Sequence, residues 1–446
     1  MTAPLTTTNP AAADPGPSTT TSTTPGTTAA PVTPAGRLRA GLATTPGRLA
    51  LATTVAVVAC LLLGVTGFLA GNGQSAALQD AQRDAAQLVG TQELRNDLVS
   101  ADATATNAFL VGGLEPTEAR ERYETSLSEA AEAVPSLAAT ARGAGEAADL
   151  AAVADSVQRY AGLVESARAN NRQGFPVGAA YLDQASAALR DEVLPTIDEV
   201  AVSTSQRVDA DMGSVSLAQA LLLFVLLSLV ALGAVQLWLA RRTHRVLNTG
   251  LAAASVALLV GGVVAAAAVL GGNGVARSVA SGPYAATVAT SEALSLATDA
   301  KSMESFTLIK RGSGGDFEES YQTSLADAKA LLAEAAEATD TGSDPLSLLN
   351  AWDEKHTEIR ALDDEGSWDD AVRAATATGD DTAGAAFTAF SDQAHADVEA
   401  MSDDAVDRLG SAATTAQVAA WIALVLGVAG AVAAAAGMNV RLKEYR

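Results

Sequence analysis

The sequence predicts an all-α protein in which four transmembrane helices carry two duplicated extracytoplasmic four-helix bundles. Three observations predict this fold class. The chain of 446 residues contains four apolar runs of about 20 residues that lack Asp, Glu, Lys and Arg. The polar segments between them place apolar residues at helical spacing and hold almost no strand signals. The order of apolar run, polar block and apolar run occurs twice, which indicates an internal duplication.

Residues 1–45 are rich in threonine and proline and hold almost no large apolar side chains. Such a segment cannot bury enough apolar surface to offset the entropy that is lost on ordering. We therefore predict a disordered cytoplasmic tail before the first apolar run.

The four apolar runs predict transmembrane helices at 46–71, 217–240, 250–271 and 416–438. A helix of about 20 residues rises about 30 Å, which matches the hydrocarbon core of a bilayer. The apolar runs contain no ionisable residue, which argues against coupled transport of ions or protons. Small residues are dense in the third and fourth runs, and they favour close packing in a compact membrane domain or in a homodimer.

Basic residues flank the apolar runs, in the turn at 241–249, in the tail at 439–446 and before the first run. The two polar blocks are acidic and account for the formal net charge of −23. Positive charge near membrane ends stays on the cytoplasmic side, so we expect a multi-pass plasma-membrane protein with both termini in the cytoplasm. The acidic surface excludes nucleic acid as a partner, while membrane lipid is an expected partner.

The first polar block, 72–216, predicts a four-helix bundle. Its apolar residues recur in alternating steps of three and four, as along the seam between packed helices. The seam comprises Leu94, Leu98, Ala101, Ala105, Ala108, Tyr123, Leu127, Ala130, Val134, Leu137, Leu150, Val153, Val157, Tyr160, Val164, Leu182, Ala185, Leu189, Val193, Ile197 and Val200. We expect the first and last bundle helices to continue the membrane helices, and Pro195 to bend the last one or open a local break.

The second polar block, 272–415, predicts a second four-helix bundle on the same plan. A Gly-Asn-Gly sequence begins both blocks, and the Tyr123–Leu127 segment has a counterpart at Tyr321–Leu325. Trp368 follows the break that we expect before the fourth helix. Several matches in the same order favour duplication over chance.

Motifs of enzymes and of metal sites are absent from the sequence. Its three histidines lack a zinc-like spacing, and it holds no phosphate-binding loop and no nucleophile elbow. The acidic run at 363–365 lacks the alternating spacing of a calcium loop, which favours a solvated loop. We therefore predict a protein that is not an enzyme and that uses no cofactor and no metal.

The cytoplasmic surface is expected to be short, without room for a kinase, a phosphatase or a long helical relay. A signal would therefore pass to a separate cytoplasmic protein. The candidate docking residues are Arg241, Arg242, His244, Arg245, Asn248, Arg441, Lys443 and Tyr445. Contact with phospholipid, which anchors the topology, is the alternative role of the basic residues.

The stretch Asn107–Pro116, followed by Tyr123, resembles the first helical turn of four-helix-bundle sensor domains such as those of chemoreceptors. The second block departs from this stretch around Phe306, so the two halves need not be equivalent. The candidate residues for extracytoplasmic sensing or docking are Asn107, Phe109, Leu110, Gly112, Gly113, Tyr123, Phe306 and Tyr321.

The layout of residues 37–446, with its basic inner turn, resembles the GlnX-type membrane proteins of actinobacteria. This resemblance implies a non-enzymatic signal relay that reports amino-acid availability. It implies two partners, an extracytoplasmic solute-binding lipoprotein of the glutamine-binding type and the cytoplasmic serine/threonine kinase G. The family has no catalytic residues to transfer to this chain.

Two other functions remain open from the sequence. The first is a direct small-molecule receptor of the chemoreceptor kind, for which Arg95, Arg120 and Arg122 are candidate ligand-binding residues. The second is a structural membrane protein of the cell envelope. Binding of small molecules to the first polar block would favour the first, and an unchanged phenotype after removal of the inner arginines would favour the second.

Overall fold

The computed structural model of the chain describes residues 45–111, 115–173, 177–213, 216–243 and 248–444. The predicted disordered tail, apart from Thr45, lies outside these described residues. Every regular element in the described ranges is a helix, and the all-α prediction is confirmed.

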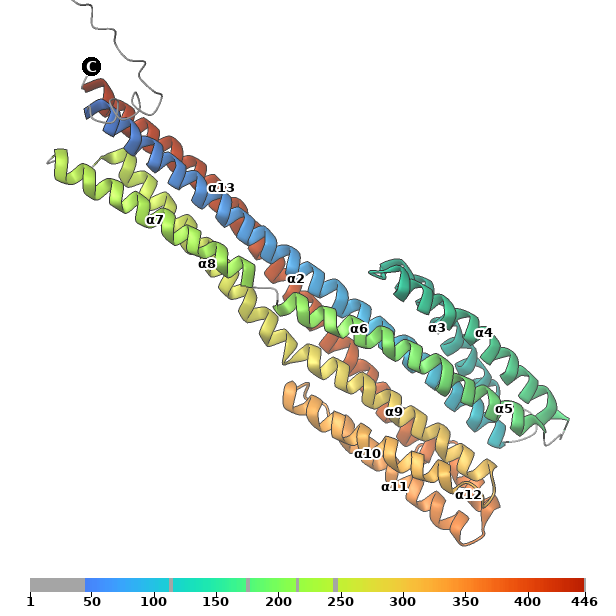
Figure 1. Ribbon diagram of the computed structural model, residues 1–446. Helices are drawn as coiled ribbons and strands as arrows, with labels where there is room; N and C mark the ends of the chain where they lie inside the picture. The colour runs from blue at the N-terminus through green and yellow to red at the C-terminus, as the bar shows by residue number, and fades with distance from the viewer. Residues whose placement is uncertain (1–44, 112–114, 174–176, 214–215, 244–247, 445–446) are drawn as a thin grey trace, which may run out of the picture.

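The helices follow one another along the chain in the order of their labels in Figure 1. They are α2 (Thr45–Val111), α3 (Thr117–Thr140), α4 (Ala144–Arg172), α5 (Val177–Ala188), η1 (Leu189–Val193), α6 (Leu194–Gly213), α7 (Ser216–Thr243), α8 (Thr249–Ala280), α9 (Pro283–Ile309), α10 (Gly315–Ala338), α11 (Pro345–Asp364), α12 (Trp368–Thr376) and α13 (Ala383–Glu444).

The molecule is a long rod (Figure 1). Helices α2 and α13 lie side by side along much of its length, and α7 and α8 complete one end. The other end holds two helical bundles, one formed with α3 to α6 and the other with α9 to α12. Because α2 and α13 belong to both ends, they connect the bundles directly to the apolar end.

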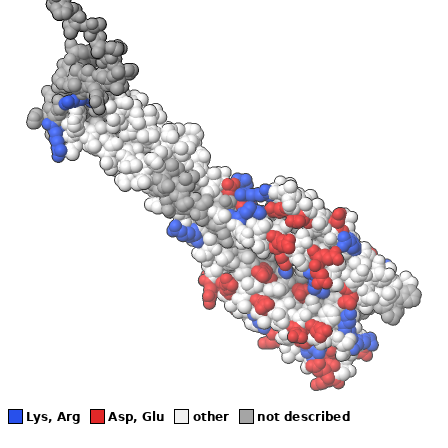
Figure 2. Space-filling view, viewed as in Figure 1, with Lys and Arg blue, Asp and Glu red and all other residues white. Residues whose placement is uncertain are grey.

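The apolar end has the composition of a membrane domain. Among the described residues, three helical segments are long and apolar enough to cross a membrane, and they lie within Gly47–Val111, Thr249–Ile309 and Ala383–Val440. Their outward leucines and valines are exposed, and Figure 2 shows a long stretch there without charged side chains. The chain is therefore a membrane protein. The described apolar part of α7, Leu223–Trp238, is shorter, so the fourth span stays a prediction.

Glycines allow the apolar helices to approach closely. A Cβ atom on Gly427 of α13 would lie 2.5 Å from the Cα atom of Gly64 on α2, and one on Gly250 would lie 2.5 Å from that of Gly437. Such small-residue contacts let helix backbones meet in a membrane, where dispersion rather than the hydrophobic effect drives association.

The first bundle consists of the C-terminal part of α2 with α3, α4 and the line of helices from α5 to α6. Apart from Leu127, which is partly buried, every residue of the predicted seam is buried. Tyr160, one of its two tyrosines, is fully buried and packs among aliphatic side chains of the other helices. The spacing of apolar residues thus places the helix faces correctly.

Pro195 lies next to a local change of helix type. The five residues Leu189–Val193 form a π-helical turn, η1, between α5 and α6. A proline lacks the backbone N–H that would bond to the carbonyl four residues earlier, here that of Asp191, so the helix loosens immediately before it. The expected local break is therefore a π-turn.

The structure differs from two sequence expectations about continuity. Helices α8 and α9 are separated at Ser281 and Gly282, where Pro283 begins α9. The expected continuity of α6 with α7 stays a prediction, because residues 214–215 lie outside the described residues. Trp368 begins a short separate helix, α12, and the fourth helix of the second bundle starts in α13.

Candidate functional site

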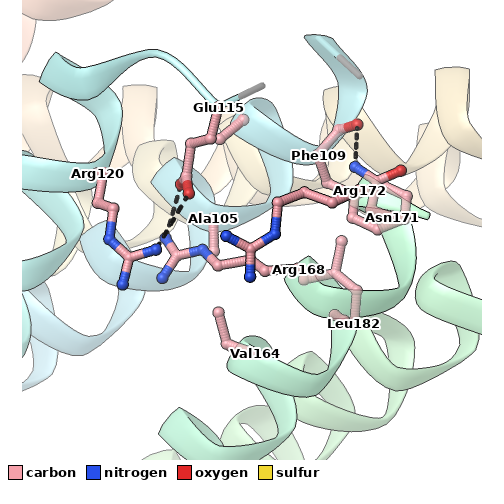
Figure 3. Close-up of a pocket in the computed structure, with 11 residues that line it drawn as sticks. Ala105, Phe109, Glu115, Arg120, Val164, Arg168, Asn171, Arg172 and Leu182 are labelled. Carbon is pink, nitrogen blue, oxygen red and sulfur yellow. Dashed lines mark hydrogen bonds and ion pairs between the residues drawn. The ribbon is translucent and has the colours of Figure 1, made fainter. Parts of the chain in front are cut away.

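The first bundle contains a cavity of about 170 Å³ at the end that is remote from the apolar helices (Figure 3). It lies between the end of α2, the start of α3, the end of α4 and α5. Its lining residues are Ala105, Ala108, Phe109, Glu115, Arg120, Val164, Ala167, Arg168, Asn171, Arg172 and Leu182. Figure 3 shows the guanidinium groups of the three arginines gathered along one side.

Glu115 and Arg168 organise the charged side of the cavity. Arg168 is 9 % exposed, and its Nη2 atom donates to Glu115 Oε1 at 2.7 Å while Nη1 donates to Glu165 at 2.7 Å. The guanidinium also lies 4.0 Å from the centre of the buried Tyr123 ring, a cation–π contact. Arg168 is thus fixed on three sides, which makes it a rigid element of the site.

Arg120 and Arg172 supply two more positive charges. Arg120 Nε donates to Glu124 at 2.7 Å, and its Nη1 lies 3.9 Å from Glu115. The pKa of Arg120 is raised by these carboxylates, mainly through the hydrogen bond to Glu124. Arg172 is exposed at the end of α4. Three cations therefore face the cavity, with one carboxylate, Glu115, among its lining residues.

A second charged cluster joins the two bundles. Asp102 of α2 is almost fully buried and accepts hydrogen bonds from Ser186 at 2.5 Å, Ser302 at 3.1 Å and Tyr160 at 3.3 Å. Burial raises the pKa of Asp102, although the charge of Arg190 opposes this. Because Ser302 belongs to α9 and Ser186 to α5, the carboxylate lies where both bundles meet.

The contact between α2 and α9 is polar along its length. Asn96 donates to Ser291 at 3.1 Å, Arg95 donates to Ser295, and Thr106 lies 3.4 Å from Ser302. The α9 serines are buried. Buried polar groups that are hydrogen-bonded across a contact fix one arrangement of their helices more strictly than apolar packing does.

The second bundle holds a buried ionic cluster around His356. Its Nδ1 lies 2.9 Å from Glu304 and its Nε2 lies 3.3 Å from Glu318, and the imidazole stacks on Tyr321 at 3.6 Å. Burial disfavours the charged imidazolium, but the hydrogen bonds and charges of both glutamates outweigh it and raise the pKa of His356. Burial would raise the pKa of Glu304, yet Lys301 and His356 lower it to about 2.

Comparison with known proteins identifies the segment that contains the cavity. Residues 77–213 match the family model of the actinobacterial sensor domain. This sensor-domain segment spans the first bundle and includes every residue that lines the cavity. No curated protein and no solved structure shows significant similarity to the chain. The match supports a sensor protein of the actinobacterial kind and favours a non-catalytic sensing role.

The structure places the residues predicted for extracytoplasmic sensing or docking in different parts of the two bundles. Phe109 lines the cavity of the sensor-domain segment, whereas Asn107 is half-buried on α2 and is not among the lining residues. Tyr123 and Tyr321 are buried in the two bundle cores. Leu110 packs in the core cluster of the second bundle, whereas Phe306 packs in that of the first.

Of that predicted set, the buried tyrosines and Phe306 therefore offer no surface to a partner. Gly112 and Gly113 lie outside the described residues. Within the described ranges, no group of three or more His, Cys, Asp or Glu side chains is placed to hold a metal ion.

The described residues of the predicted cytoplasmic set lie at the opposite end from the sensor-domain segment. Arg241 is exposed at the end of α7. Asn248 caps α8, since its Oδ1 accepts from the Gly250 N–H at 3.1 Å while its Nδ2 donates to the Gly437 carbonyl at 3.1 Å. Three of the predicted residues, His244, Arg245 and Tyr445, lie outside the described residues. Helices contain the backbones of the others, Arg242, Arg441 and Lys443.

Sequence reasoning missed Arg168, Arg172 and Glu115 in the cavity and the bonding pattern of Asp102. The sequence spacing could have predicted that Arg168 and Arg172 lie together. They are four residues apart at the end of one helix and therefore face the same side. Asp102 also carries a signal, since it directly follows the seam residue Ala101 and a charge at that position requires a buried partner.

Proposed function

We propose that the protein is a non-enzymatic transmembrane sensor that relays a signal from the sensor-domain segment to the opposite side of the membrane. The observation that carries this proposal is the continuity of α2, which runs for 67 residues as one helix from Phe109 at the cavity into an apolar span. At 1.5 Å per residue this is about 100 Å. A shift of an ångström or two at one end of a rigid helix reaches the other end.

We further propose that the bundles lie outside the cell and that both termini lie in the cytoplasm. The signal is the availability of amino acids, which a solute-binding lipoprotein reports to the bundles. A serine/threonine kinase receives the signal in the cytoplasm. The likeness to GlnX-type proteins supports these partners. The acidic bundle end and the exposed Arg241 at the other end support the orientation.

A break in α2 tests the relay. Ala76 is exposed on α2 between the apolar span and the first bundle, so Ala76→Pro removes a backbone hydrogen bond without removing a core side chain. In a strain that lacks the gene and carries this variant, we expect amino-acid-dependent phosphorylation of the kinase substrate to be lost. The wild-type gene should restore it.

The matched control is Ala144→Pro, at the first position of α4, where a proline is tolerated because the N–H has no helical partner. This variant should signal normally. Equal phosphorylation responses in the deletion strain and the wild type, with the protein shown to be inserted in the membrane, would refute the relay.

A direct small-molecule receptor is the second candidate function. The arginine-lined cavity of the sensor-domain segment favours it, because a protein that reads only a lipoprotein surface needs no internal cavity. The two candidates share the α2 relay and differ in what moves α2, a ligand in the cavity or a lipoprotein on the bundle surface.

A further inference from the structure

We propose that the cavity of the first bundle is a binding site for a small carboxylate anion with a short apolar chain. This inference rests on the proposed sensor function and assigns a ligand class to the sensor-domain segment. Its evidence is the charge of the lining, the geometry of the arginines, the apolar wall and the contrast with the second bundle.

The charge of the lining favours an anion. Arg120, Arg168 and Arg172 line the cavity with a single carboxylate, Glu115. Glu165 and Glu124, which also bind these arginines, are about half exposed at the rim. Among the described residues, no acidic side chain forms an ion pair with Arg172. Its guanidinium is therefore available to an incoming anion, and it lies beside two others (Figure 3).

The arginine geometry favours a carboxylate. Glu115 already shows how a carboxylate sits here, since it contacts Arg168 at 2.7 Å and Arg120 at 3.9 Å. A guanidinium presents its donors in a planar fork that matches the two oxygens of a carboxylate. Tyr123 and Glu165 hold Arg168 in place, so a ligand would meet a preformed donor.

Apart from Asn171, whose Nδ2 donates to the Phe109 carbonyl at 3.5 Å, the remaining wall of the cavity is apolar. Phe109, Ala105 and Ala108 come from α2, Val164 from α4 and Leu182 from α5. A volume of about 170 Å³ admits a small organic molecule but not a peptide. The ligand is thus expected to place its carboxylate on the arginines and a short hydrocarbon chain against α2.

The equivalent end of the second bundle is filled by aromatic side chains. Trp368 of α12 donates its indole N–H to the Leu308 carbonyl at 2.8 Å, and Arg311 stacks over its ring at 3.7 Å. Phe317 of α10 stacks on Phe306 at 5.1 Å. The two bundles therefore differ at this end, and we assign the ligand site to the first bundle.

Calorimetry of the full chain in lipid nanodiscs tests the site. The probes are sodium butyrate and sodium succinate, with butyramide as the uncharged analogue and inorganic phosphate as a competing anion class. We expect binding of at least one carboxylate and none of butyramide. Absence of binding by both carboxylates, equal binding of butyramide, or tighter binding of phosphate would overturn the proposal.

Three variants locate the binding in the cavity. Arg172→Gln is expected to weaken carboxylate binding at least tenfold, whereas Glu115→Gln should strengthen it several-fold because an internal competitor loses its charge. Arg159→Gln is the matched control, since Arg159 is exposed on the same helix and pairs with Glu192 outside the cavity. Unchanged binding by Arg172→Gln would overturn the site.

The binding test is independent of the relay test. Ala76→Pro should leave carboxylate binding unchanged while signalling is lost, because the cavity lies about 30 residues farther along α2. In the wild-type protein, binding without signalling would contradict the proposed function alone. Signalling by the wild-type protein without binding of these probes would contradict the carboxylate site alone.

Discussion

Asp102 of α2 and Asp299 of α9 share one cation, Arg190, although they belong to different bundles. Arg190 Nε donates to Asp299 at 2.9 Å, and its Nη2 donates to Asp102 at 3.3 Å. Each aspartate precedes the phenylalanine of its block, Phe109 or Phe306, by seven residues. Arg190 lies in the π-turn before Pro195, so the irregular turn of the last helix carries the residue that links the halves.

Loss of Arg190 should therefore destabilise both bundles together. Arg190→Gln leaves the buried charge of Asp102 with hydroxyl donors alone, and breaking a buried pair in this way costs about 3 kcal/mol. We expect a single thermal transition in nanodiscs that shifts to lower temperature. Asp102→Asn in the same chain should recover much of the loss, because the unpaired charge is removed.

The control for this change is Arg159→Gln, whose exposed ion pair with Glu192 contributes at most about 1 kcal/mol. If Arg190→Gln and Arg159→Gln unfolded at the same temperature, Arg190 would not couple the halves.

The cluster around His356 should make the stability of the second bundle depend on pH. The raised pKa of His356 gives a contribution that is full below pH 6.5, its unfolded value, and is lost as pH rises through the folded value. The lowered pKa of Glu304 gives a contribution that is present above pH 4.5 and is lost as pH falls toward about 2. Both contributions are thus present between pH 4.5 and 6.5.

We expect His356→Gln to lower the thermal midpoint most at pH 5 to 6, and progressively less as the pH rises through the raised pKa of His356 and the wild-type imidazole loses its proton. The exposed His395 provides the matched control, His395→Gln. A difference between wild type and His356→Gln that stays constant from pH 5 to pH 9 would show that the imidazole acts only through packing.

The helices and their buried faces could be predicted from the sequence, whereas the contacts between the halves could not. The step of three and four residues at Leu150, Val153 and Val157 is a local pattern, and it directly states which face is buried. The bond between Ser302 and Asp102 joins residues 200 positions apart, and no local spacing reports it. The cavity could not be predicted from local spacing either, because Glu115 and Arg168 meet only after α3 and α4 have packed.

The breaks in helices are harder to predict than the helices. Pro195 indicates a disturbance but does not decide between a bend, a gap and a π-turn. The sequence predicts that Trp368 leads the fourth helix of the second bundle, yet its indole N–H bonds to the Leu308 carbonyl and holds a separate short helix there. The deciding interaction in that case is tertiary.

Asp97 on α2 makes the first bundle less stable as the pH rises, which is the same direction as the contribution of His356 to the second bundle. Burial, reinforced by the charges of Glu129 and Glu93, raises the pKa of Asp97 to about 7. An aspartate whose pKa is raised on folding costs stability above its unfolded pKa, and the cost is complete above pH 7. We expect Asp97→Asn to raise the thermal midpoint at pH 8 and to change it little at pH 4.

Asp155→Asn, at an exposed position on α4, should leave the midpoint unchanged at both pH values. An Asp97→Asn variant that gained no stability at pH 8 would show that this carboxylate is solvated in the folded protein.

The contact between Gly427 and Gly64 should control how α2 and α13 pack in the apolar end. Gly427→Ala places a Cβ atom 2.5 Å from the Gly64 Cα atom, so the two helices must separate. Gly233→Ala on α7 is the matched control, because no atom lies within 4 Å of its added Cβ and alanine favours a helix by roughly 0.5–1 kcal/mol.

We expect Gly427→Ala to lower the thermal midpoint in nanodiscs and to weaken signalling through the proposed relay, because α2 and α13 each run as one helix from a bundle into the apolar end. Gly233→Ala should leave both unchanged or raise the midpoint slightly. If the two variants behaved alike, the close approach of α2 and α13 would contribute neither to the stability of the apolar end nor to the relay.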